Sequence, residues 1–248
     1  MGTVDYGELA RRSAATFGEM LAVVGRSGGG PDAVVRRPDA VGASLAAMVD
    51  GTLVGNPWFD AAVVPAGAVP PPDDPLLPYC LWTFAGRAGG RVEDPSIATP
   101  AMGLELGEAS GPTAAGIVEV LVPSTALVGT LNDRAYGSDP ALGRLAAGLE
   151  DDRVRTHGLA VDGRTVCVAM TLVLGDDLGI HYVATDADHR RRGLATLLLT
   201  EVMDRARAEG MRTATLQASP DGLPVYRRMG FRVVGVLHGF VRPRSDLG

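Results

Sequence analysis

Three adjacent arginines stand directly before a predicted helix, at a place where a cation is useful only if an anion binds. Arg190, Arg191 and Arg192 precede Gly193. The helix N-terminus carries the positive end of the macrodipole, so each arginine there is unfavourable by a few tenths to about 1 kcal/mol without a ligand. Gly193 and Ala195 keep side chains off the first turn, which leaves its backbone N–H groups open to an anion. This pattern predicts a phosphate-binding turn.

A second explanation stays open at this stretch. Asp186 and Asp188 precede the arginines and could balance them as a solvated charge run. The composition restricts the chemistry further, because all 23 basic side chains are arginine and the chain has no lysine. This excludes Schiff-base and pyridoxal-phosphate chemistry, a P-loop and a kinase-type phosphate lysine, since each needs a primary amine.

The overall composition predicts a globular protein of one large or two ordinary domains, with 248 residues and 46% hydrophobic side chains. Residues 1–150 hold 9 arginines and 17 acids, and residues 151–248 hold 14 and 12. The basic character is therefore local, and we expect neither nucleic acid nor a membrane surface as partner. Cys80 and Cys167 lie far apart with no CxxC pattern, so we expect no metal. We expect neither a signal peptide nor a membrane span, and we expect a cytoplasmic, reduced location.

The second part of the chain has a regular pattern. A turn-forming bridge at 108–113 predicts a domain boundary, with domains at 1–107 and 108–248. Apolar periodicity then predicts, in order, a strand at 117–122, helices at 124–136 and 140–149, strands at 156–161, 165–174 and 178–185, a helix at 194–209, a strand at 213–218, a helix at 223–229 and a strand at 231–237. Asp162-Gly163 is the preferred dipeptide of a tight hairpin. We expect an α/β fold with a mixed, mostly antiparallel twisted sheet flanked by helices.

The first part predicts a smaller α+β domain. An amphipathic helix at 5–26 is followed by strand-like runs at 33–37, 41–48, 58–64, 79–84 and 102–106. The segment 65–78 contains six prolines, a density that no regular element tolerates, so we expect a loop there. No catalytic constellation is visible in this part.

The second part resembles the GNAT superfamily of N-acetyltransferases. The family signature, [Q/R]-x-x-G-x-[G/A] between a central strand and a long helix, is matched by Arg190, Gly193 and Ala195. A second feature, an aromatic helix leading into Gly-Phe and a last strand, is matched by the segment 224–231 with Tyr226. The resemblance covers roughly residues 108–240 and includes the order of strands and helices.

The resemblance implies acetyl-CoA as cosubstrate. The pantetheine arm would pair with the backbone of Val183, Ala184 and Thr185, as a peptide adds to an exposed strand edge. The pyrophosphate would lie in the turn made of Arg190, Arg191, Arg192, Gly193, Leu194, Ala195 and Thr196.

The resemblance also implies catalytic residues. Tyr226 stands at the family position of the general acid, where a phenol protonates the thiolate that leaves the thioester. With a thiol pKa near 8.5 and a phenol pKa near 10, this transfer is uphill by only about 2 kcal/mol. Ser219 stands where relatives have a residue that orders the thiol end, although a turn-capping role fits equally well.

The general base stays open. Some relatives place a glutamate eleven residues before the signature, but here that position is Gly179. His181 projects from the same strand face and has an intrinsic pKa near neutrality, so we take it as a candidate base beside a structural role. Asp176, Asp177 and a water chain remain alternatives.

The sequence thus predicts an N-acetyltransferase that acts on a primary amine of a small molecule or antibiotic-like metabolite. A protein or peptide acetyltransferase, and a non-catalytic acyl-CoA sensor, are the alternatives; intact Tyr226 favours catalysis. Residues 1–107 could be a degenerate GNAT half, as in tandem GNAT proteins, or an unrelated α+β cap or dimerisation module, and a homodimer stays open. The acceptor cannot be read from the sequence.

Overall fold

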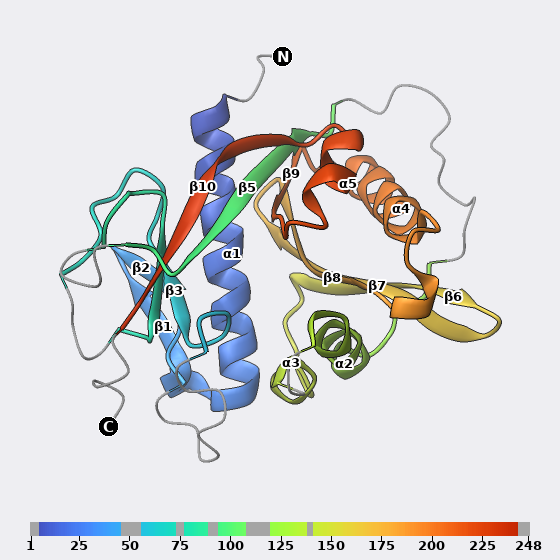
Figure 1. The fold of residues 1–248 in the computed structure, drawn as a ribbon, viewed down its shortest axis with the longest axis horizontal. Helices are drawn as coiled ribbons and strands as arrows, with labels where there is room; N and C mark the ends of the chain where they lie inside the picture. Colours follow the sequence, from blue (N-terminus) through green and yellow to red (C-terminus); the bar gives the residue numbers. More distant parts are fainter. Residues whose placement is uncertain are drawn as a thin grey trace.

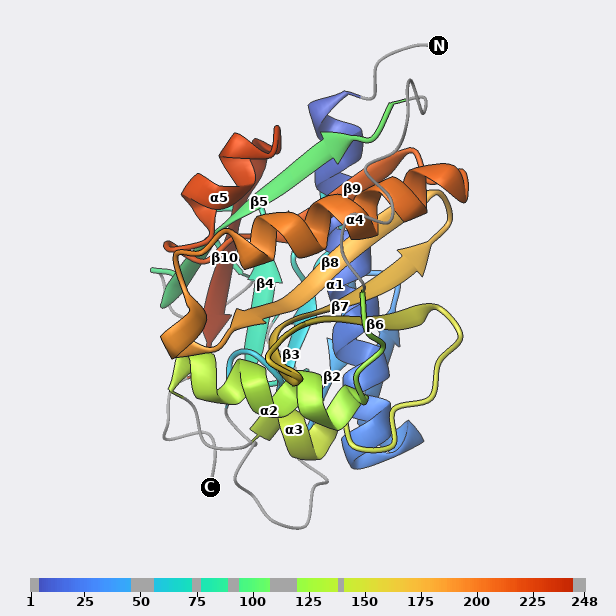
Figure 2. The same cartoon turned by 90° about the vertical axis from the view of Figure 1, so that its right-hand side faces the viewer.

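The computed structural model describes residues 5–45, 56–72, 77–88, 94–107, 120–137 and 141–242. These residues form one ten-stranded sheet with helices on both faces (Figures 1 and 2). The elements are α1 (Tyr6–Gly29), η1 (Pro31–Ala33), β1 (Val34–Arg37), β2 (Ala40–Ala43), β3 (Ala61–Val63), β4 (Cys80–Thr83), β5 (Ile97–Glu105), α2 (Thr125–Tyr136), α3 (Ala141–Leu145), β6 (Val154–Val161), β7 (Arg164–Leu174), β8 (Asp177–Thr185), η2 (Ala187–His189), α4 (Leu194–Ala208), β9 (Thr213–Gln217), α5 (Leu223–Arg228) and β10 (Arg232–Val241).

From either edge, the sheet has four strands in chain order followed by the last strand of the other half. The strand order runs β1-β2-β3-β4-β10-β5-β9-β8-β7-β6. β3 pairs parallel with β4, as β8 does with β9, and every other neighbouring pair of named strands is antiparallel. Each half of the sheet therefore repeats the pairing pattern of the other half.

The two halves exchange their last strands. β5 ends the first half of the chain but pairs with β9, whereas β10 ends the second half and pairs with β4. The two exchanged strands also pair with each other over most of their length. A predicted strand at 231–237 is thus too short, because pairing on two sides extends β10 to Val241. The predicted strand at 102–106 is extended for the same reason, to Ile97–Glu105.

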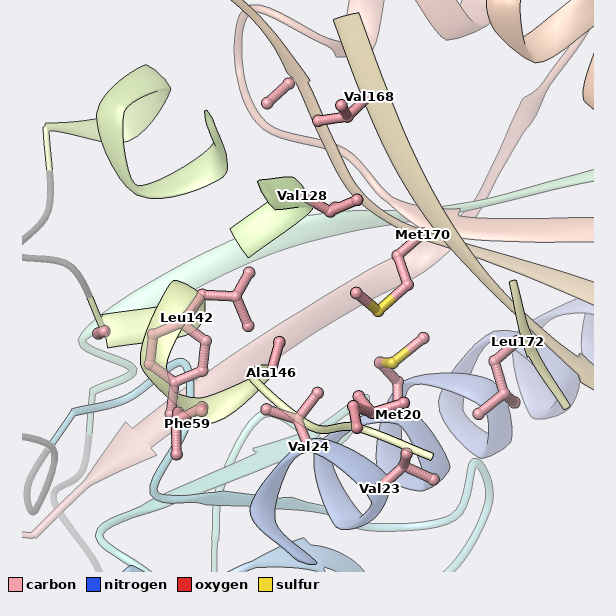
Figure 3. Packing of buried hydrophobic residues seen from close by; sticks show 14 of the residues in the cluster. Met20, Val23, Val24, Phe59, Val128, Leu142, Ala146, Val168, Met170 and Leu172 are labelled. Carbon is pink, nitrogen blue, oxygen red and sulfur yellow. The ribbon is translucent and has the colours of Figure 1, made fainter. Parts of the chain in front are cut away.

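Helices α1, α2 and α3 cover one face of the sheet, and α4 and α5 cover the other (Figure 2). Figure 3 shows how the first face is filled: Met20 and Val24 of α1 pack with Met170 of β7 and with Leu142 of α3, and Phe59 of the first half enters the same cluster. α1 is buried on most sides because it lies against β2, β3, β5, β8 and β9, strands of both halves. The predicted domains at 1–107 and 108–248 therefore share one sheet, and residues of both pack in the same hydrophobic cluster.

The structure confirms the predicted helix cap at Ser124 and the predicted hairpin turn at Asp162-Gly163. Ser124 caps α2, since its side chain accepts a hydrogen bond from the N–H of Leu127. The hairpin between β6 and β7 turns at Asp162 and Gly163, whose φ angles are 52° and 76°. α1 continues from the predicted helix to Gly29, and Gly30 caps it with φ 76°.

Other expected elements differ or cannot be compared. The strand predicted at 41–48 is Ala40–Ala43, and the helix predicted at 140–149 is the shorter Ala141–Leu145. The predicted connection at 108–113 lies outside the described residues, and so do residues 117–119 of the strand predicted at 117–122. Leu121 of that predicted strand forms an isolated β-bridge with Gly158.

The proline-rich segment joins β3 to β4 without a regular element in its described residues, 64–72 and 77–79. In the mirrored pattern this connection corresponds to the one from β8 to β9, which holds α4. Loop residues such as Leu77 and Ala88 cover the sheet at this position, together with Phe240 and Leu81. Among the described residues, no helix has the length and apolar character needed to cross a membrane.

Candidate functional site

The strands β8 and β9 separate in the second half of the sheet. Their parallel pairing ends at Ile180 and Leu216, whereas β8 continues to Thr185. Its other edge stays paired with β7, where Ala184 lies opposite Val168. One edge of residues 181–185 therefore has no strand partner among the described residues. The predicted pantetheine-binding residues Val183, Ala184 and Thr185 all lie on this edge.

A bulge in β8 turns its side chains just after the separation. The register with β7 shifts between Val168 and Met170, and Tyr182 takes a left-handed backbone conformation with φ 50°. As a result Tyr182 packs into the cluster on the α1 face, whereas Val183 packs against the α4 side. Such bulges commonly occur beside functional sites because they redirect backbone and side-chain groups.

The turn between β8 and α4 presents free backbone N–H groups. Gly193 caps α4 with φ 76°, and no side chain supplies a cap hydrogen bond. The first N–H to bond back along the helix is that of Leu197, which donates to the carbonyl of Gly193. The N–H groups of Leu194, Ala195 and Thr196 precede it, so the first turn can receive an anion.

The three arginines of this turn have different environments, which the sequence does not show. Arg190 donates to the carbonyls of Thr185 at 3.2 Å and Ala135 at 2.8 Å, so its guanidinium joins the end of β8 to the end of α2. Arg192 donates to the carbonyl of Asp188 at 3.1 Å. Arg191 is exposed and makes no hydrogen bond or ion pair with a described residue. Two of the three guanidinium groups are thus bonded to backbone carbonyls, whereas that of Arg191 is not.

The acids before the arginines do not neutralise them by direct contact. Asp186 forms an ion pair with Arg164 at 2.9 Å and lies 3.3 Å from the ring of His189. It also accepts a hydrogen bond from the N–H of Asp188. These bonds keep the pKa of Asp186 below its usual range, with His189 the main cause. Among the described residues, neither Asp186 nor Asp188 forms an ion pair with the three arginines.

Tyr226 lies on the opposite side of the separation, on α5. Its side chain is buried in the cluster on the α4 face and meets Phe231 edge to face at 6.0 Å. Burial raises the pKa of Tyr226, and nearby Tyr136 and Cys167 raise it further. Its hydroxyl has no hydrogen-bond partner among the described residues, so it is a protonated phenol with its bonding capacity free.

Ser219 has the turn-capping role that the sequence left open. Its side-chain oxygen accepts a hydrogen bond from the N–H of Gly222 at 3.2 Å, and its carbonyl accepts one from the N–H of Leu223. These bonds position the start of α5 and hence Tyr226. A further role at the thiol remains a prediction.

The environment of His181 does not suit a general base. Its ring is buried and stacks against Phe17 of α1, with ring centroids 6.5 Å apart. Its Nε2 atom is buried without a hydrogen-bond partner. Burial lowers the pKa of His181 to about 3, so the ring is neutral and very weakly basic. The expectation of a near-neutral pKa is corrected, because α1 covers this strand face.

The same helix fills the position that some relatives give to a glutamate. A Cβ atom added to Gly179 would lie 2.6 Å from Cβ of Thr16 and 2.7 Å from Nε2 of His181. Both distances are far inside van der Waals contact, so α1 and His181 leave no room for a side chain there.

The two alternative acids lie at the far end of β8. Asp176 forms ion pairs with Arg12 and Arg212. Asp177 is buried and accepts hydrogen bonds from Thr213 at 2.5 Å and Thr215 at 2.6 Å. Burial raises the pKa of Asp177 despite these bonds. Asp177 begins β8, whereas the free edge ends it, so both acids hold the sheet together rather than face the separation.

Two contacts at the separation were not anticipated. Gln217 at the end of β9 donates to the side chain and carbonyl of Ser13 at 2.9 and 3.1 Å. Thr185 donates to the buried thiol of Cys167 at 3.3 Å. Ser13 and Gln217 lie 204 positions apart, so no local signal reveals their contact, whereas Cys167 and Thr185 lie opposite each other in the β7–β8 hairpin. Among the described residues, no group of three or more His, Cys, Asp or Glu side chains could hold a metal ion.

Comparisons with known proteins agree with this geometry. Residues 142–238 match the family model of the acetyltransferase (GNAT) domain. The chain is 31% identical over 118 residues to a mycothiol acetyltransferase of Clavibacter michiganensis, covering 43% of this chain and 39% of the relative. It is 29% identical over 87 residues to the [ribosomal protein bS18]-alanine N-acetyltransferase of Salmonella typhimurium, covering 34% and 59%. The matched segments thus span 39% and 59% of the length of these two curated relatives, less than two thirds in each case.

Among solved structures, the fold is similar to that of a GCN5-related N-acetyltransferase from Kribbella flavida. The TM-score is 0.58 at 19% identity, with 94% of this chain and 95% of that chain covered. The similarity includes both halves of the sheet.

Proposed function

We propose that this chain, in which residues 142–238 carry a GNAT acetyltransferase domain, transfers an acetyl group from acetyl-CoA to a primary amine of a small molecule. The observation that supports this most is one continuous path for an acyl-CoA. The unpaired edge of β8 leads to the open first turn of α4 at one end, and the free hydroxyl of Tyr226 lies across the separation.

The residues on this path fit acetyl-CoA. Backbone groups of Val183, Ala184 and Thr185 would hydrogen-bond the pantetheine amides, as in strand addition. The N–H groups at the start of α4 would bind the pyrophosphate, with Arg191 as the guanidinium free to reach it. When bound, acetyl-CoA supplies an activated acyl group with a thiol leaving group.

Tyr226 would act as the general acid. A proton on its oxygen can pass to the departing thiolate, because a hydroxyl without a competing partner can turn toward it. Burial keeps this phenol protonated well above neutral pH. Arg190 and Ser219 would act as positioning residues, the first for the turn and the second for α5.

We infer further that the first half is a degenerate GNAT half rather than an unrelated cap. The mirrored strand order and the exchange of last strands support this. Its counterpart of α4 is replaced by the proline-rich connection, so the first half lacks a helix start for pyrophosphate in the described residues. One acetyl-CoA per chain is the expected stoichiometry.

A protein N-terminus is the second candidate acceptor. The match to an enzyme named for acetylating the alanine of a ribosomal protein favours it, whereas the mycothiol acetyltransferase match favours a small molecule. The chemistry at the separation would be the same for both.

The experiment is a set of acceptors incubated with acetyl-CoA, with released CoA measured by a thiol reagent. The set contains small amines, amino sugars and peptides with a free N-terminal alanine. We expect turnover with at least one class and a fall of at least tenfold in Tyr226→Phe, with unchanged affinity for acetyl-CoA. Phe231→Leu is a matched control, since it alters the ring beside Tyr226 but no hydroxyl. Equal rates in wild type and Tyr226→Phe would contradict the general-acid role, and no acetyl-CoA binding would refute the proposed function.

A further inference from the structure

We propose that α1, a helix of the first half, forms the floor of the acyl site and restricts the transferred group to a short chain. This inference rests on the proposed function and adds to it the class of acyl donor. It concerns residues that lie more than 150 positions before the acyl-CoA motif in the sequence.

The acyl-CoA motif and Tyr226 determine the direction in which an acyl group would point. The start of α4 and the side chain of Tyr226 both lie on the α4 face of the sheet. A thioester held along the free edge of β8 would have its sulfur on that face, near Tyr226. Its acyl group would then enter the separation between β8 and β9 and approach the opposite face, which α1 covers.

Two side chains flank the separation where this acyl group would enter. The first residues beyond the last paired positions are His181 on β8 and Gln217 on β9. His181 stacks against Phe17 of α1, at an interplanar angle of 21°. Gln217 is hydrogen-bonded to Ser13, one turn earlier on the same helix. The two side chains that flank the separation are thus both held by α1.

α1 is held firmly against the sheet. Ser13 and Thr16 have no exposed surface, and Phe17 is 7% exposed. The Thr16 hydroxyl lies 3.2 Å from that of Thr215 on β9, and Phe17 packs edge to face with Trp82 at 5.8 Å. Gly103 of β5 would place a Cβ atom 3.0 Å from Leu9, so the helix lies close on the sheet. Among the described residues, α1 is therefore packed closely against the sheet beside the separation, and we expect a long acyl chain to enter there only if α1 moves.

The floor is also mainly apolar and uncharged. The imidazole of His181 is neutral, the ring of Phe17 is apolar, and Gln217 has no charge. A methyl group fits such a floor, whereas a terminal carboxylate, as in succinyl-CoA, would lose its hydration without gaining a cation. We therefore expect acetyl-CoA to be preferred both to longer and to acidic acyl donors.

The test is the affinity of wild-type protein for CoA, acetyl-CoA, butyryl-CoA, hexanoyl-CoA and succinyl-CoA, measured by calorimetry without an acceptor. Burial of each extra methylene in a roomy apolar site would tighten binding roughly fourfold. A closed floor predicts the reverse, with butyryl-CoA at least tenfold weaker than acetyl-CoA and hexanoyl-CoA weaker still.

Two variants open the floor, and one controls for general loosening. Phe17→Leu removes the ring beneath His181, and Gln217→Ala removes the side chain at the mouth of the separation. Each should reduce the difference between butyryl-CoA and acetyl-CoA to about threefold or less. Phe59→Leu makes the same change as Phe17→Leu in the cluster beside α3, away from the separation, and should keep the wild-type difference.

The outcomes separate this inference from the proposed function. Equal affinity of wild type for acetyl-CoA and butyryl-CoA overturns the floor but leaves the acetyltransferase proposal standing. An unchanged ratio in folded Phe17→Leu and Gln217→Ala also overturns it. Failure of both CoA and acetyl-CoA to bind refutes the proposed function itself. The wild-type series needs no variant, so the inference can be refuted even if Phe17→Leu does not fold.

Discussion

Arg191 provides the sharpest test of the phosphate-binding turn, because it is the one arginine of the three without a partner among the described residues. An exposed guanidinium at a helix start contributes about 1 kcal/mol to binding of a phosphate. Since 1.4 kcal/mol is tenfold in affinity, Arg191→Gln should weaken acetyl-CoA binding about fivefold. Arg191→Glu adds repulsion of similar size and should weaken it about thirtyfold.

The backbone of Arg191 allows the charge to be separated from the conformation. Its φ of 59° is left-handed, which costs a non-glycine residue about 1 kcal/mol. Arg191→Gly removes the charge and relieves this strain. It should therefore bind acetyl-CoA as weakly as Arg191→Gln but unfold at the same or a higher temperature.

The assay is calorimetric titration with acetyl-CoA at two salt concentrations, together with thermal unfolding. Arg212→Gln is the matched control, because Arg212 is also exposed and basic but lies beside Asp176 at the far end of β8. Its affinity should equal that of wild type. Equal affinities of Arg191→Glu and Arg212→Gln would refute the assignment of the turn.

Three further predictions concern the packing around the site. Gly179→Glu should not supply a base but should lower the free energy of unfolding in urea by about 2 kcal/mol or more, because its Cβ would lie 2.6 Å from Thr16. If this variant were as stable as wild type, α1 would not be packed against Gly179. The free energy of unfolding should fall as pH drops from 6.5 toward 4, because burial lowers the pKa of His181 to about 3 and that of His157 to about 4. The unfolded chain binds more protons than the folded protein in this window, and each histidine accounts for roughly 3 kcal/mol at pH 4. The variant His181→Phe should therefore show a smaller pH dependence of unfolding. Arg190→Met should lower the free energy of unfolding by about 1 kcal/mol, because two exposed carbonyls exchange this donor for water, and a variant as stable as wild type would argue against that link.

The local features of the site could be predicted from the sequence, whereas its long-range contacts could not. Gly193 and the arginines before α4 indicate an open helix start because capping and charge act within one turn. The role of Arg190 depends on Ala135, a carbonyl 55 positions away, and no periodicity reports such a contact. The sequence makes His181 a candidate base, because no local pattern shows that α1 covers its strand face.

The fold shows the same division. Hairpins and helices with caps follow from turn chemistry and apolar period, as at Asp162 and Ser124. The exchange of β5 and β10 follows from pairing between strands that lie about 130 residues apart, which loop closure and packing decide. A prediction made segment by segment therefore divides the chain into two domains and does not show that they share one sheet.

Hydrogen exchange of backbone amides with and without acetyl-CoA tests directly whether acetyl-CoA binds along the free edge of β8. We expect slower exchange in two segments, 181–185 of β8 and 193–196 at the start of α4, and no change in the mirrored strands β3 and β4. Protection of β3 and β4 instead, or of neither region at saturating acetyl-CoA, would contradict it.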